Sequence, residues 1–138
     1  MRPKAPLLAA ACVSIAACSI PEVEAELQRD CGPLDGPAFT ILIPDGENVV
    51  RAYGPNWPDM GDGRYEVEPG NRMEPVAISL CDGAFGRCER ATHGSFAVTP
   101  QDDGGFAGTL QAVFPESGSR RLSFTAHEDA DYEPPMCG

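Results

Sequence analysis

Short runs of β-branched and aromatic residues, separated by turns, are the feature that most limits what this chain can fold into. Residues 38–43 and 48–53 flank Asp45 and Gly46, a pair typical of tight hairpin turns. Within residues 105–114 and 120–128, apolar side chains recur at every second position, as they do in a sheet with one buried face. No stretch shows a convincing helical period. We therefore predict an all-β fold, a small antiparallel β-sandwich, with a small β-barrel as the alternative.

Four more strands are expected between these hairpins, at residues 64–68, 74–81, 87–92 and 95–99. The segment 54–63 contains two prolines, Trp57 and two aspartates, so it is expected to form a loop. Strands at a spacing of roughly ten residues are typical of sandwiches and small barrels. The chain has 138 residues, enough for one domain with one modest core.

The N-terminus carries the features of an export signal. Arg2 and Lys4 supply positive charge, residues 5–17 are apolar, and Ile15-Ala16-Ala17-Cys18 places two small residues before a cysteine. The apolar stretch is too short for a transmembrane helix, which needs roughly 20 residues. This segment resembles the signal peptide and lipobox of bacterial lipoproteins, and the resemblance ends with the lipobox.

The resemblance implies that Cys18 becomes the first mature residue and carries several acyl chains. Two or more chains anchor a protein stably, because each buried CH2 contributes about 0.8 kcal/mol. In lipoproteins an aspartate after the cysteine is an inner-membrane signal, so Ser19 implies the outer membrane of a bacterial cell envelope. Lipidation of Cys12 and ordinary secretion with cleavage elsewhere are the alternatives.

Three parts are expected along the chain: a signal peptide over residues 1–17, a tether over 18–35 and a β-domain over 36–138. The tether is expected because Glu22, Glu24 and Glu26 make this stretch polar and acidic. A short helical turn around residues 24–29 is compatible with that spacer.

Four cysteines remain once Cys12 is removed and Cys18 is lipidated: Cys31, Cys81, Cys88 and Cys137. In an exported chain an even number predicts disulfides, and four cysteines allow three connectivities. Cys81 and Cys88 bracket a glycine-rich segment that can turn back on itself, so we expect these two to pair. Cys31 then pairs with Cys137. A zinc site is disfavoured, because the spacings are not those of zinc knuckles.

The charge balance limits the classes of partner. The chain has 10 basic and 21 acidic residues and a formal net charge of −11. Arg2 and Lys4 lie in the signal peptide, so every later cation is an arginine. Nucleic acids and anionic lipid headgroups are therefore poor partners, whereas a cationic protein is a favourable one. Solubility alone is the competing explanation for so acidic a composition.

No catalytic motif is evident. His93 and His127 are the only histidines, and no G-x-S-x-G elbow, phosphate-binding glycine loop or H-E-x-x-H motif is present. Structural calcium has candidate ligands, although none has EF-hand spacing. They are the acidic residues Asp45, Asp59, Asp62, Glu128, Asp129, Asp131 and Glu133. We expect a non-enzymatic protein without metal or cofactor.

The candidate binding residues are aromatic and arginine side chains in loops. Phe85, Arg87 and Arg90 lie in or beside the turn that the Cys81–Cys88 pair would close, and rigid aromatic and arginine groups are favoured in interface hot spots. Trp57 is a second candidate. The structural alternatives are that Phe85 folds over the core and that Trp57 plugs one end of the fold.

Together these features predict a lipid-anchored envelope protein that acts as a protein-binding or envelope-structural module. A cationic envelope protein is the expected partner, and the membrane is contacted through the anchor. The alternative is an inhibitor of a cationic envelope hydrolase such as a lysozyme.

Overall fold

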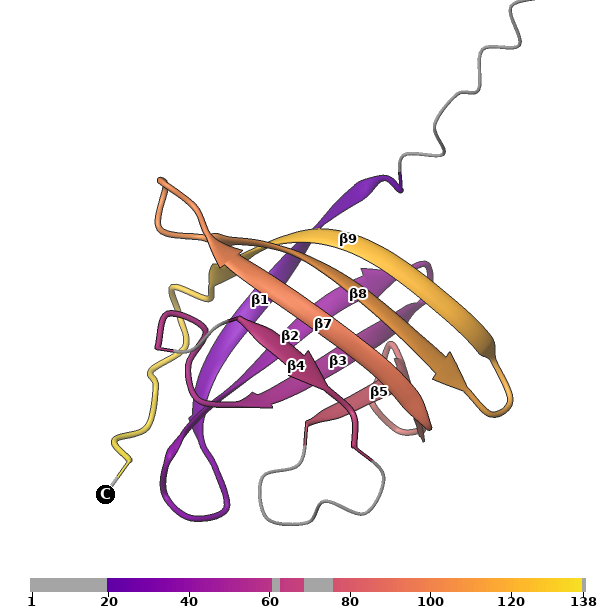
Figure 1. Cartoon of the computed structure of the whole chain (residues 1–138), viewed down its shortest axis with the longest axis horizontal. Helices are drawn as coiled ribbons and strands as arrows, with labels where there is room; N and C mark the ends of the chain where they lie inside the picture. The colour runs from indigo at the N-terminus through magenta and orange to yellow at the C-terminus, as the bar shows by residue number, and fades with distance from the viewer. Residues whose placement is uncertain (1–19, 61–62, 69–75, 138) are drawn as a thin grey trace, which may run out of the picture.

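The computed structural model describes residues 20–60, 63–68 and 76–137, and in these residues every regular element is a β-strand (Figure 1). The strands, in chain order, are β1 Glu22–Cys31, β2 Pro37–Asp45, β3 Asn48–Pro55, β4 Arg64–Glu66, β5 Ala77–Asp82, β6 Cys88–Arg90, β7 His93–Pro100, β8 Phe106–Phe114 and β9 Gly118–Glu128. The predicted all-β class is confirmed. The strands expected after residue 36 are present, with small shifts at their ends.

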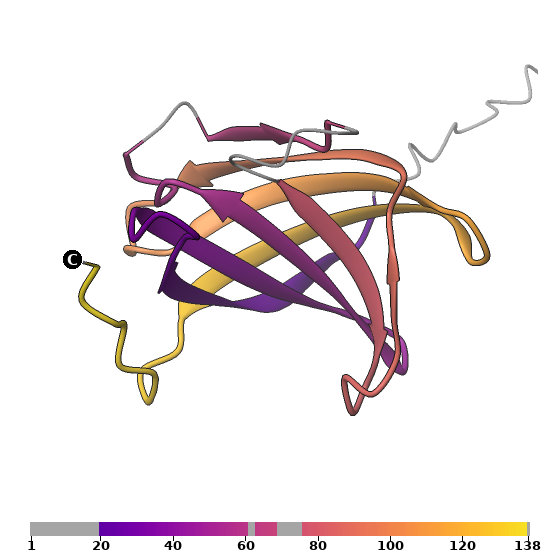
Figure 2. The ribbon, with the colours of Figure 1, turned by 90° about the horizontal axis from the view of Figure 1, so that it is seen from below.

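All nine strands belong to one sheet in the order β4-β7-β8-β9-β1-β2-β3-β5-β6. Neighbouring strands are antiparallel, except that β1 and β9 run parallel. The sheet curls into a half-barrel, so that β7 and β8 face β2 and β3 across the interior (Figure 2). A single curled sheet thus supplies the two facing layers that a sandwich would build from separate sheets.

Alternating side chains fill the concave face of this sheet. In β8, Phe106, Leu110, Ala112 and Phe114 are buried, as their shared parity predicts. Phe124 and Ala126 of β9 are fully buried beside them. The residues between these positions point outward, so any surface for a partner has to be assembled from the opposite parity.

Aromatic rings join the two facing halves of the sheet. The Phe39 ring on β2 lies 5.1 Å from the Tyr65 ring on β4 and 6.1 Å from the Phe96 ring on β7, measured between centroids. Gly54 on β3 makes this packing feasible, because a Cβ there would lie 2.7 Å from the Phe39 ring. The close approach explains why a residue without a side chain occupies this strand position.

The stretch expected to be a tether is largely a strand, and this expectation is wrong for residues 22–31. β1 pairs with β2 on one side and with β9 on the other, and Ala25 and Leu27 are buried in the core. No helical turn forms in β1. The physical reason is that Val23, Ala25 and Leu27 share one parity, so pairing on both edges buries an apolar row while the glutamates stay outside.

Both predicted disulfides are present. Cys31 at the end of β1 is bonded to Cys137, and Cys81 on β5 is bonded to Cys88 on β6. Closing the long loop contributes about 4 to 5 kcal/mol in the chain-entropy model, and closing the short one about 2 to 3 kcal/mol. The long bridge holds the C-terminal segment against the strand that joins the two halves of the sheet.

β6 and the residues after it contact both halves of the sheet. The Ala91 amide donates to the Ile78 carbonyl of β5, and the adjacent Thr92 amide donates to the Val113 carbonyl of β8. The Glu89 carboxylate accepts hydrogen bonds from the Ser117 hydroxyl and from the amides of Glu116 and Ser117 in the β8–β9 turn. The Ser117 hydroxyl and these amides lower the pKa of Glu89, because all of them favour its charged form.

We expect Leu27→Ala to destabilise the domain by about 2 to 5 kcal/mol, because it opens a cavity beside two strand pairings. Urea unfolding followed by circular dichroism measures this loss. Glu22→Ala on the exposed face of β1 is the matched control and should change stability by less than about 0.5 kcal/mol. Equal stability of the two variants would show that residues 22–31 are a spacer.

We expect Glu89→Gln to lower the midpoint of thermal unfolding at neutral pH. The Glu89 pKa is depressed in the folded state, so its stabilising contribution is complete above the unfolded pKa and is lost as the pH falls through the folded pKa. Thermal scans of both proteins from neutral to acidic pH should therefore converge at the acidic end. A difference that stays constant across this range would contradict the assigned role.

Candidate functional site

Phe85 lies at the tip of the turn that the Cys81–Cys88 disulfide closes. Its side chain is 44% exposed, and its backbone has φ of +56°, a left-handed conformation that is rare for a bulky residue. The turn is fixed by Asp82, whose carbonyl accepts the Phe85 amide at 2.9 Å and whose carboxylate accepts the Gly86 amide at 2.9 Å. The ring is thus held outside the core, next to the outer face of β3.

The Phe85 ring forms one wall of a groove on the convex face of the sheet. The groove has a volume of about 580 Å³ and crosses β9, β1, β2 and β3. Register explains how its lining comes together, because Glu26 pairs with Leu42 on β2 and with His127 on β9, while Pro44 pairs with Val49 on β3. We call this site the acidic groove, lined by Glu24, Ala25, Glu26, Leu42, Pro44, Val49, Phe85, His127, Glu128 and Asp129.

The acidic groove combines an apolar side with an acidic side. Leu42, Pro44 and Val49 extend from the Phe85 ring along β2 and β3, whereas the carboxylates come from β1 and from the end of β9. Among the described residues, Glu24 and Glu26 have no cationic partner. The Arg51 guanidinium lies over the Phe85 ring, with its central carbon 6.0 Å from the ring centroid.

One groove carboxylate already has a cationic partner. Glu128 accepts a hydrogen bond of 2.7 Å from Arg29 Nε. Burial alone would lower the pKa of Arg29, but its hydrogen bonds to Asp59 and Glu128 outweigh that effect and raise it. The negative charge that faces a partner therefore comes from Glu24, Glu26 and Asp129 more than from Glu128.

His127 connects the acidic groove to the turn between β7 and β8. Its Nε2 lies 3.1 Å from Asp103 Oδ2, and both side chains are exposed. The Gly105 amide and the His127 ring lower the pKa of Asp103, because both stabilise the carboxylate. His127 thus points outward, and its partner is this aspartate.

Arg87 and Arg90 are exposed but line no part of the acidic groove. Arg87 is in the turn after Phe85, where its carbonyl accepts the Asp82 amide. Arg90 belongs to β6, opposite Ser79 of β5. The structure therefore brings only Phe85 of this sequence-predicted group into the groove, and binding by the two arginines remains a prediction.

Trp57 lies at the opposite end of the strands from Phe85, in the loop after β3. Its ring packs against the core and is covered by the Arg29 guanidinium, 5.0 Å from the ring centroid. Arg29 also forms two hydrogen bonds with Asp59, at 3.2 and 3.3 Å, which tie this loop to β1. Trp57 thus closes one end of the fold, and its indole nitrogen is buried without a hydrogen-bond partner.

Three of the candidate calcium ligands are in ion pairs with arginines. Asp59 and Glu128 bond to Arg29, and Asp45 accepts a hydrogen bond of 3.0 Å from Arg120 Nε. No group of three residues suited to a metal ion occurs within residues 20–60, 63–68 and 76–137. Asp62, Cys12, Cys18 and the signal peptide lie outside the described residues.

Most residues of the acidic groove were not predicted as a site. Glu24 and Glu26 were assigned to a solvated tether, although the alternation of glutamate with Val23, Ala25 and Leu27 is a strand signal. Leu42, Pro44 and Val49 gave no signal of their own, because outward apolar residues on single strands are common. Only the pairing of four strands brings these side chains together.

The described part of the chain contains no helix long and apolar enough to cross a membrane. No protein-family model, no curated protein and no solved structure matches this chain.

Proposed function

We propose that this chain is a lipid-anchored binding protein of the bacterial cell envelope, and that the acidic groove holds a cationic, amphipathic segment of another envelope protein. The observation that carries the proposal is the composition of the groove, an apolar row ending at Phe85 beside unpaired carboxylates. Basic side chains of such a segment would face Glu24 and Glu26, and its apolar side chains would pack on Leu42, Val49 and Phe85.

Rigidity supports this role for Phe85. A side chain whose conformation is already fixed loses little entropy on binding, and aromatic residues dominate interface energies. The disulfide and the Asp82 hydrogen bonds hold the Phe85 backbone in a left-handed conformation that a flexible turn would leave. The strained conformation is thus maintained by surrounding covalent and hydrogen bonds, and it keeps the ring at the groove.

The position of β1 in the chain limits the distance between the acidic groove and the membrane. With a lipid on Cys18, three residues lie between the anchor and Glu22, so the extended link spans at most about 14 Å. Glu24 of the groove follows two residues later. This short link replaces the long spacer expected from the sequence, and it favours a partner that is itself at the membrane surface.

The alternative, inhibition of a cationic envelope hydrolase such as a lysozyme, is favoured by the same carboxylates. In that case the groove would take a basic loop of the folded enzyme. The two functions differ in what the partner loses on binding, since only the hydrolase loses activity.

We expect the wild-type protein to fractionate with membranes when it is produced in bacteria, and Cys18→Ser to be released from them. Mass spectrometry of the wild-type protein should then find a modified cysteine at residue 18 as its N-terminus. Cys12→Ser is the matched control and should behave like the wild type. If Cys12→Ser is released instead, the anchor is at Cys12. If both variants fractionate like the wild-type protein, the lipid anchor is refuted.

We expect a peptide of alternating lysine and leucine to bind the wild-type chain, and Phe85→Gly to weaken this binding at least about tenfold. Glycine removes the ring and suits the positive φ, so this variant should stay folded. Replacing Glu24 and Glu26 with glutamine should also weaken binding. The same change at the exposed Glu133, combined with Asp102→Asn, is the control with equal loss of charge. Calorimetry of the full chain in uncharged micelles measures the affinities.

A peptide control separates specific binding from attraction between net charges, and the salt dependence measures the electrostatic part of the affinity. Raising the ionic strength from about 0.01 to about 1 M shortens the Debye length from about 30 to about 3 Å, so the affinity should fall. A peptide with serine in place of leucine should bind poorly. Equal binding of both peptides, or no effect of Phe85→Gly, would rule out the groove.

A lysozyme assay at low salt tests the alternative, which requires inhibition that Phe85→Gly relieves.

A further inference from the structure

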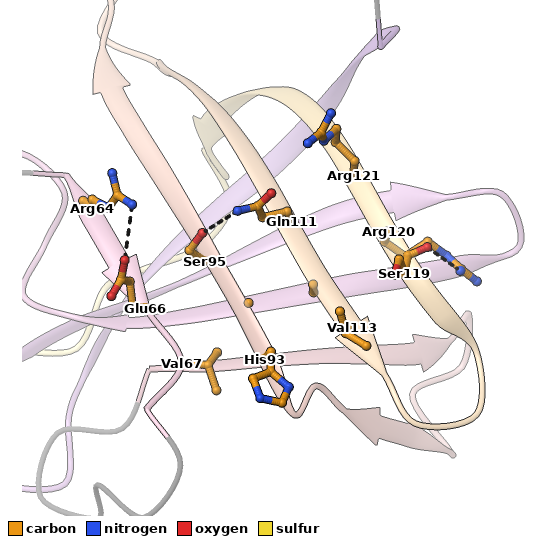
Figure 3. Close-up of a pocket in the computed structure, with 12 residues that line it drawn as sticks. Arg64, Glu66, Val67, His93, Ser95, Gln111, Val113, Ser119, Arg120 and Arg121 are labelled. Atoms are coloured by element: carbon orange, nitrogen blue, oxygen red, sulfur yellow. Dashed lines mark hydrogen bonds and ion pairs between the residues drawn. The ribbon is translucent and has the colours of Figure 1, made fainter.

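A second hollow lies on the convex face of the other half of the sheet, over β4, β7, β8 and β9 (Figure 3). Its volume is about 650 Å³, and it shares no lining residue with the acidic groove. An adjoining hollow of about 240 Å³ is lined in part by the same Arg64, Ser95 and Gln111. We call the larger one the arginine hollow, because Arg64, Arg120 and Arg121 all line it.

Strand register builds a row of polar side chains across this hollow. Glu66 pairs with Ser95, Ser95 with Gln111, and Gln111 with Arg121. The Gln111 amide donates a hydrogen bond of 3.4 Å to the Ser95 hydroxyl, and in Figure 3 this pair lies between Arg64 and Arg121. The row thus presents hydroxyl, amide and guanidinium groups at successive strands.

Carboxylates pair with two of the three arginines, Asp45 with Arg120 and Glu66 with Arg64, so the net positive charge of the hollow comes from Arg121. Among the described residues no carboxylate pairs with Arg121, which is exposed at the edge of the hollow. Within the part of the lining that the structure describes, Glu66 is the only carboxylate, and it accepts a hydrogen bond of 3.2 Å from Arg64. His93 also lines the hollow, and its Nδ1 lies 3.1 Å from the Thr92 hydroxyl oxygen. The site therefore favours an anion.

The mixed apolar and polar lining of the hollow indicates an organic molecule rather than a lone ion. The lining includes Val67, which is half-buried, and Val113, which is 44% exposed, so part of the surface is apolar. A guanidinium group matches the oxygens of phosphate with two parallel hydrogen bonds. Gln111 and Ser95 can then bond hydroxyl groups near that phosphate.

We propose that the arginine hollow binds a phosphate group carried by a small hydroxylated molecule, with Arg121 as its main contact. Gln111 and Ser95 orient the hydroxylated part, and Val113 packs against its carbon atoms. The phosphate has two sources, a soluble metabolite or the headgroup of a lipid near the anchor. This site is independent of the acidic groove, and either can exist without the other.

We expect glycerol 3-phosphate to bind the full chain in uncharged, phosphate-free detergent micelles, in a saturable manner, and glycerol not to bind. Arg121→Gln should weaken binding at least about tenfold, because it removes a charge-assisted pair of hydrogen bonds. Arg90→Gln, an equal loss of charge on exposed β6 outside the hollow, should leave the affinity unchanged. Titration calorimetry measures the affinities, and thermal scans check that both variants are folded.

Lipid added to these micelles identifies the source of the phosphate. If lipid headgroups fill the hollow, phosphatidylglycerol should weaken the binding of glycerol 3-phosphate more than an equal charge supplied by oleate, which has no phosphate. Equal effects of the two lipids would assign the hollow to a soluble ligand. Absence of saturable binding, equal binding of glycerol or of the carboxylate glycerate, or an unchanged affinity of Arg121→Gln would overturn the proposal.

Discussion

The pairing of β1 on both of its edges is the constraint on which the rest of the structure depends. On its antiparallel edge β1 is followed by β2, β3, β5 and β6. On its parallel edge it is followed by β9, β8, β7 and β4. The curl that encloses the core requires this central strand, because β9 and β2 have no other continuous link through the sheet. The disulfide at Cys31 secures the same strand to the chain's end. β1, whose acidic sequence resembles a spacer, therefore joins the two halves of the domain.

The closed interior explains why both candidate sites lie outside. Phenylalanine, leucine and isoleucine side chains fill the concave face, and Arg120 and Asp45 form an ion pair of 3.0 Å near the start of β9. What remains is the outer parity of each strand. On β9, β1, β2 and β3 the outward side chains include carboxylates, which lie beside Phe85. On β4, β7, β8 and β9 the outward side chains include arginines. Two surfaces of different chemistry thus follow from one sheet.

Much of the fold could be predicted because its signals are local. The Asp45–Gly46 turn, the alternation in β8 and β9, and the short spacing of Cys81 and Cys88 each concern neighbouring residues. β1 was missed because glutamate, alanine and leucine also favour helices, so its composition opposed its alternation. The pairing that makes this segment a strand rather than a helix joins residues about a hundred positions apart, such as Ala25 with Ala126. A pattern confined to one segment cannot reveal such a partner.

The sequence by itself determined the strand class, the parity of most core positions and both disulfides, because turn chemistry, side-chain alternation and cysteine number act over short distances or by elimination. The tertiary structure decided that residues 22–31 form a strand and that Trp57 closes an end beneath Arg29. It also decided which outward side chains meet. Glu26, Leu42 and His127 become neighbours only through the register of three strands, as do Ser95, Gln111 and Arg121. Register is set by burial of the whole inner face, so it belongs to the fold and not to any one segment.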